Sequence, residues 1–156
     1  MYKRFLLGIS CLFVLTISSV SIYNSVLTPS KNGQVKGIFE DLDKKSFSSL
    51  SSLEAKNLIE QKKLDKSFEI LDVRNSQERN LGFIKNSINL DFYNSNFEQN
   101  LDNLDKNKSY LVYCKTGFRS KKTTNLMKEK GFSQVYNLNG GILAWEYQGF
   151  EISKLN

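Results

Sequence analysis

The feature that most constrains this chain is an alternation of short apolar runs with segments that favour helix. Four runs rich in β-branched and aromatic residues are expected to be buried strands; they cover 68–73, 87–90, 110–113 and 135–138. Strands that alternate with helices at short spacing predict an α/β fold with a mostly parallel central sheet flanked by helices on both faces.

The expected helices are bounded by capping residues and glycines. Ser51 or Ser52 is a suitable N-cap for the first helix, and Gly131 is expected at the C-terminal end of a later one. The segments predicted to be helical are 54–61, 77–81, 97–104, 119–130 and a last helix that follows Gly140-Gly141 and carries Trp145.

Cys114 follows the strand expected over 110–113 and opens the sequence Cys114-Lys115-Thr116-Gly117-Phe118-Arg119-Ser120. Ligands of parallel sheets bind beyond the carboxyl ends of the strands, and Cys114 is expected at such an end. The loop amides and the N-terminus of the next helix direct positive partial charge at the sulfur, which favours the reactive thiolate. A buried structural cysteine is the alternative, but Lys115, Gly117 and Arg119 are unusual neighbours for one.

Composition excludes several classes of chemistry. The 156-residue chain is the length of a single domain, and it contains no histidine and only two cysteines. Ser-His-Asp and Cys-His catalysis, a disulfide framework and most zinc sites are therefore excluded, and no metal or cofactor is expected. The net charge of +6 favours a surface with a slight cationic bias, and attraction of anionic substrates is the alternative interpretation. No nucleic-acid partner is expected because the basic residues are scattered.

The N-terminal segment is expected to direct export. Lys3 and Arg4 precede an apolar stretch, and no charged residue occurs from Phe5 to Ser30. This pattern indicates a signal peptide or membrane anchor over residues 1–26, with possible membrane anchoring through 5–23. Cys11 lies too early in the apolar run for lipidation. The rest of the chain is expected to be periplasmic or otherwise extracytoplasmic, with a polar linker over 27–45 and one domain over 46–152.

Four motifs, in order and with matching spacing, resemble those of a single-domain rhodanese. They are the strand Ile70-Leu71-Asp72-Val73-Arg74, the segment from Glu78 through Gly82 and Ile84 to Leu90, the loop from Cys114 to Ser120, and Gly140-Gly141-Ile142-Leu143-Ala144-Trp145. Two positions depart from the family pattern: Phe83 stands where histidine is usual, and Asn86 where glycine is usual. Neither lies in the cysteine loop, so we expect them to affect local packing more than chemistry.

The resemblance implies a thiosulfate sulfurtransferase-like enzyme with Cys114 as the nucleophile. Its thiolate would take sulfane sulfur from a small anionic donor such as thiosulfate and pass it to a thiol or to cyanide. The resemblance implies a substrate-binding loop that cradles the persulfide and the donor; it consists of Lys115, Thr116, Gly117, Phe118, Arg119 and Ser120.

Four charged side chains in or near the loop are candidates for binding or support. Arg119 is suited to bind an anionic donor, or it pairs with Asp72 or another acid. Asp72 and Arg74 are expected to support the loops as a charged pair at a strand end. Lys115 is expected to point outward, where it either steers anions or is simply solvated.

Three other functions remain as alternatives. A phosphatase or arsenate reductase of the same fold is disfavoured because such sites have five residues between cysteine and arginine, and here four separate Cys114 from Arg119. A catalytically silent, membrane-tethered binding module would be expected to have lost Cys114. A redox sensor is the third alternative, since a solitary exported cysteine can be oxidised or pair with a partner protein.

Overall fold

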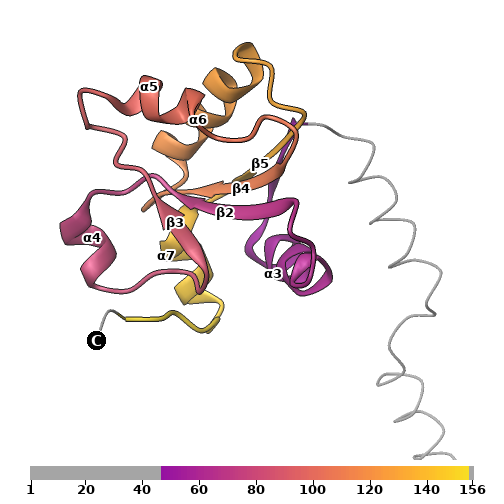
Figure 1. Ribbon diagram of the computed structural model, residues 1–156. Helices are drawn as coiled ribbons and strands as arrows, with labels where there is room; N and C mark the ends of the chain where they lie inside the picture. The colour runs from indigo at the N-terminus through magenta and orange to yellow at the C-terminus, as the bar shows by residue number, and fades with distance from the viewer. Residues whose placement is uncertain (1–46, 155–156) are drawn as a thin grey trace, which may run out of the picture. The chain divides into compact units, whose positions relative to one another are not determined.

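The computed structural model describes residues 47–154, so the predicted leader (1–26) and linker (27–45) lie outside the described residues. No helix within 47–154 is both long and apolar enough to cross a bilayer. The described part contains a five-stranded sheet and five helices (Figure 1).

All five strands of the sheet are parallel, in the order β1-β5-β4-β2-β3. Their bounds are Phe47–Leu50 for β1, Phe68–Asp72 for β2, Ser87–Asn89 for β3, Ser109–Tyr113 for β4 and Gln134–Leu138 for β5. The predicted parallel α/β fold is confirmed, and four of the strands lie where the apolar runs placed them. The edge strand β1 was not predicted.

The helices are α3 (Ser52–Lys62), α4 (Ser76–Asn80), α5 (Phe97–Asp102), α6 (Phe118–Glu129) and α7 (Gly141–Tyr147). Ser51, rather than Ser52, caps α3: its side chain accepts from the backbone N–H of Glu54, whose carboxylate accepts in return from the N–H of Ser51. Such reciprocal capping satisfies amides that the first helical turn leaves free. Gly131 follows the C-cap of α6 with a φ of 84°, as expected for a glycine that ends a helix.

Alternate residues of the central strands form two apolar clusters on opposite faces of the sheet. One cluster gathers Ile70, Leu111 and Leu138 with side chains from α3 and α7. The other gathers Leu71, Val112 and Val135 with side chains from α5 and α6. Figure 1 shows the same two layers of helices, one on each side of the sheet. Because strand residues alternate between faces, near-continuous apolar runs such as 110–113 supply both clusters.

The sheet order creates a switch point between β2 and β4. After β2 the chain continues to β3 on one side, and after β4 it continues to β5 on the other. In open parallel sheets a crevice forms at the carboxyl ends of two strands whose connections diverge in this way, and ligands bind there. The segments that follow β2 and β4 are therefore the ones that meet at a candidate site.

The two departures from the family pattern have local explanations. Asn86 has a φ of 64° and is the one non-glycine residue with positive φ in 47–154; asparagine tolerates this left-handed region better than most residues. The Phe83 ring packs under the guanidinium of Arg79, 4.2 Å from ring centroid to Cζ, and its backbone pairs with Ser153. Both positions thus shape the chain between α4 and β3.

Candidate active site around Cys114

Cys114 lies immediately after β4, at the switch point of the sheet, and its side chain is 1% exposed. The loop that follows turns sharply into α6, which begins at Phe118. Gly117 makes this turn with a φ of 90°, and a β-carbon there would lie 3.0 Å from the backbone nitrogen of Gly140. Glycine is required here both for its backbone conformation and for the close approach of the two loops.

The Cys114 sulfur sits in a cradle of hydrogen-bond donors. The backbone N–H of Gly117 donates to Sγ at 3.1 Å, and the hydroxyl of the buried Ser120 donates to Sγ at 3.6 Å. Burial raises the pKa of the Cys114 thiol and is the largest single influence. Hydrogen bonds from Ser120, Thr116 and Gly117 outweigh it, so the pKa lies below its ordinary value. Donors that stabilise the charged form lower a pKa in this way, and the thiolate is the nucleophilic form.

The N-terminus of α7 holds the loop from behind. The backbone N–H of Ile142 donates to the Cys114 carbonyl at 2.9 Å, and that of Leu143 donates to the Lys115 carbonyl at 3.2 Å. Gly141 allows this contact, since a β-carbon there would lie 2.6 Å from the Lys115 carbonyl oxygen. With two carbonyls engaged by α7, the following amides of the loop are left to face the sulfur. The Gly-Gly motif therefore acts on Cys114 through the loop backbone.

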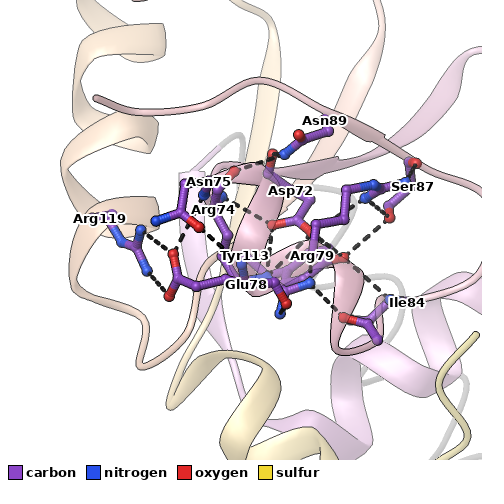
Figure 2. A network of polar contacts seen from close by, with 11 residues as sticks. Asp72, Arg74, Asn75, Glu78, Arg79, Ile84, Ser87, Asn89, Tyr113 and Arg119 are labelled. Atoms are coloured by element: carbon purple, nitrogen blue, oxygen red, sulfur yellow. Dashed lines mark hydrogen bonds and ion pairs between the residues drawn. The ribbon is translucent and has the colours of Figure 1, made fainter. Parts of the chain in front are cut away.

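Arg119 forms a two-pronged ion pair with Glu78, which follows β2 on α4 (Figure 2). Its two terminal nitrogens lie 2.7 and 2.6 Å from the two carboxylate oxygens. The hydrogen bonds from Arg119 lower the pKa of Glu78, and those to Glu78 raise the pKa of Arg119. Of the acids considered from the sequence, Asp72 is thus not the partner of Arg119. The guanidinium also lies 5.4 Å from the Tyr93 ring centroid.

Asp72 and Arg74 form the centre of a second, buried network. The Arg74 Nη2 lies 2.7 Å from the Asp72 carboxylate and 2.7 Å from the Gly82 carbonyl. Asp72 also accepts from Arg79 and from the hydroxyl of Tyr113. Figure 2 shows how these side chains link the end of β2 to α4, to the start of β3 and to β4. The network positions the two segments that carry Cys114 and Glu78.

Tyr113, the residue next to Cys114, connects the end of β4 to this network. Its hydroxyl accepts from the Ile84 N–H at 3.1 Å and donates to Asp72 at 2.8 Å. Burial raises the pKa of Tyr113 to about 12, so the phenol stays protonated near neutral pH. It serves to fix the end of β4 and is not a general base for Cys114.

The predicted loop residues fall into two groups. Gly117 and Ser120 donate to the sulfur, and the backbone of Thr116 also contributes a hydrogen bond to it. Lys115, Thr116 and Phe118 are exposed residues, and Arg119 is the loop residue that pairs with Glu78. A pocket of about 180 Å³ adjoins the loop; it is lined by Arg74, Glu78, Leu81, Gly82, Lys115, Ile142, Leu143 and Glu146.

Sequence reasoning did not assign roles to Glu78, Arg79 or Tyr113, nor to the Ile142 and Leu143 amides. Within 47–154 no three side chains of cysteine, aspartate or glutamate are grouped as a metal site would require.

The parallel α/β fold and the loop that begins at Cys114 are shared with a known protein family. A family model described as "Rhodanese-like domain" matches residues 51–148. This chain therefore belongs to the rhodanese-like domain family.

Solved structures of rhodanese-like proteins have the same fold as this chain. A rhodanese-like domain protein from Staphylococcus aureus is 30% identical, with a TM-score of 0.57, over 70% of this chain and 99% of that one. A rhodanese-related protein from Thermoplasma volcanium is 27% identical, with a TM-score of 0.57, over 68% of this chain and 97% of that one.

Curated relatives include longer proteins with a different named activity. A tRNA uridine(34) hydroxylase from Legionella pneumophila (strain Paris) is 42% identical over 80 residues, which cover 47% of this chain and 31% of that protein. The matches to three such hydroxylases cover 31%, 25% and 31% of their lengths. This chain therefore spans a third or less of the curated relatives that it matches.

Proposed function

We propose that this protein is a sulfurtransferase that carries sulfane sulfur on Cys114. The observation that carries the proposal is the placement of the Cys114 sulfur among the Gly117 amide and the Ser120 hydroxyl, with a lowered thiol pKa. A thiol whose pKa is lowered by surrounding hydrogen-bond donors is suited to attack sulfur as the thiolate, and the same donors can hold the product persulfide.

In the first half-reaction, the Cys114 thiolate attacks the outer sulfur of the donor. A new bond forms between Sγ and that sulfur, and the bond between the two donor sulfurs breaks. With thiosulfate, sulfite leaves with the electron pair, and Cys114 becomes a persulfide anion. The charge of the thiolate moves to the outer sulfur, where the amides of the loop from Lys115 to Ser120 stabilise it.

In the second half-reaction, a thiolate or cyanide attacks the outer sulfur of the persulfide. The bond from that sulfur to Sγ breaks, the electron pair returns to Sγ, and the Cys114 thiolate is regenerated. Cyanide yields thiocyanate by this step. No redox cofactor is consumed because the sulfur is transferred at an unchanged oxidation level, and the two half-reactions give ping-pong kinetics.

The activity named for the longer relatives is not part of this proposal. A thiol or cyanide acceptor requires only the loop described above, and the absence of a nucleic-acid partner stays a prediction. Likewise, residues 1–26 are proposed to export the domain to the periplasm or a similar extracytoplasmic space, with 5–23 able to anchor it.

Steady-state kinetics on the full-length protein test the proposal. With thiosulfate and cyanide varied together, double-reciprocal plots should be parallel. The Cys114→Ser variant should fold as the wild type does but form no thiocyanate. Turnover that survives in Cys114→Ser, or intersecting lines that require a ternary complex, would contradict the proposal.

A further inference from the structure

We propose that Glu78 determines the class of sulfur donor. By pairing with Arg119 it disfavours dianionic inorganic donors such as thiosulfate and favours organic persulfides, in which the outer sulfur is attached through sulfur to a carbon group. This inference rests on the proposed sulfur transfer and adds a substrate preference to it.

The first observation is that the cation best placed to bind a donor anion is already occupied. Both terminal nitrogens of Arg119 are bound to Glu78, and the two side chains are only 11% and 21% exposed. The Glu78 carboxylate is itself fixed, because it also accepts from the N–H of Asn75 in the capping box of α4. An anion can engage Arg119 only by competing with a preformed two-pronged pair.

The second observation concerns charge. The lowered pKa of Glu78 keeps its carboxylate ionised near neutral pH, so the pair adds no net positive charge to the site. The attraction of an approaching anion by Arg119 is therefore largely offset by its repulsion from Glu78, and a dianion loses twice as much net attraction by this offset as a monoanion does. The nearby Arg74 does not compensate, because its guanidinium is committed to Asp72. Lys115 is exposed, where solvent screens its attraction.

The third observation is an apolar wall beside the loop. Leu81 and Leu143 are 78% and 47% exposed, and both line the pocket that also includes Ile142, Lys115 and Glu78. The pocket, of about 180 Å³, provides apolar surface for a small carbon group. Burial of such a group is favourable, whereas the sulfite portion of thiosulfate has nothing apolar to place there.

The proposed step is balanced without another reactant. The Cys114 thiolate attacks the outer sulfur of R–S–S–H, the bond between the two donor sulfurs breaks, and R–S⁻ leaves with the electron pair. Cys114 then carries –S–S–H, which exchanges its proton with solvent. The carbon group R stays against Leu81 and Leu143 until the thiolate departs.

The test is donor-selective kinetics on the full-length protein with Glu78→Gln. Glutamine keeps an oxygen for the capping bond from Asn75 but removes the charge, which leaves Arg119 free to bind anions. We expect kcat/KM for thiosulfate to rise about tenfold, mostly through KM, on the scale of one unit charge near a partly buried site. For ethyl persulfide generated in situ, kcat/KM should change less than about twofold.

Two further variants separate selectivity from general effects. Glu146→Gln removes a carboxylate at the same pocket that is not bonded to Arg119, and it should raise thiosulfate use much less than Glu78→Gln does. In an Arg119→Gln background, Glu78→Gln should give no gain with thiosulfate, because the effect acts through Arg119.

Equal changes for both donors in Glu78→Gln would overturn the inference and leave Glu78 a purely structural residue. A wild-type protein that takes sulfur from neither donor would instead overturn the proposed function. These two failures are distinguishable because the second is seen without any Glu78 variant.

Discussion

Replacing Asp72 with asparagine should cost a large part of the stability of the domain. The Asp72 carboxylate is completely buried and lies between the guanidiniums of Arg74 and Arg79, at 2.7 and 3.2 Å. Arg74 is only 4% exposed, so Asp72→Asn leaves buried positive charge without its counter-ion. Breaking a buried pair in this way costs about 3–5 kcal/mol, out of the roughly 5–15 kcal/mol that keeps a typical domain folded.

Urea denaturation of the full-length protein measures this loss. With a slope of about 1–3 kcal/mol per molar urea, the unfolding midpoint of Asp72→Asn should fall by roughly 2 M. Asp102→Asn is the matched control, because Asp102 also contacts two cations, Lys130 and Lys106, but at the surface. Its midpoint should stay within the error of the fit. If Asp72→Asn behaves like Asp102→Asn, the network is not holding the site together.

Three further outcomes are expected. Ser120→Ala removes a donor to the Cys114 sulfur, so the thiol pKa should rise, and the pH profile of Cys114 alkylation should shift to higher pH; an unshifted profile would refute the role of the hydroxyl. Gly141→Ala places a β-carbon against the Lys115 carbonyl, whereas the β-carbon of the control Gly131→Ala meets no atom within 4 Å. Both substitutions strain a positive φ by about 1 kcal/mol, but only Gly141→Ala should abolish sulfur transfer. Equal activities of the two variants would contradict the contact between α7 and the cysteine loop. Because the pKa of Glu78 is lowered in the folded protein, its contribution to stability is present above its unfolded pKa of about 4.3 and is lost as pH falls through the folded pKa. The difference in unfolding free energy between wild type and Glu78→Gln should therefore shrink on acidification. A difference that grows on acidification would be inconsistent with the ion pair.

Most of the fold could be predicted from the sequence because the buried strands are almost uniformly apolar. The runs at 110–113 and 135–138 match β4 and β5 to within one residue at their ends. The strand β1 was missed because its sequence, Phe47-Ser48-Ser49-Leu50, lacks a continuous apolar run. It is held as an edge strand by backbone pairing with β5, a long-range interaction that its own residues do not encode.

The site could be predicted only in part, because some of its contacts join residues that are far apart in the sequence. The loop from Cys114 to Ser120 is contiguous, so its local geometry followed from glycine spacing and the helix start. The partner of Arg119 is 41 residues away in sequence, and identifying Glu78 requires knowing that β2 and β4 are neighbours in the sheet. Once the order β1-β5-β4-β2-β3 is known, an acid just after β2 becomes the natural partner for a base just after β4.

Intact mass spectrometry shows directly whether Cys114 accepts a sulfur atom from a donor. The full-length protein would be measured before and after incubation with excess thiosulfate or ethyl persulfide, alongside Cys114→Ser. We expect a gain equal to one sulfur atom in the wild type, removed by cyanide and absent from Cys114→Ser. A wild-type protein that stays folded with a free thiol and gains no mass with either thiosulfate or ethyl persulfide would contradict sulfur transfer by Cys114.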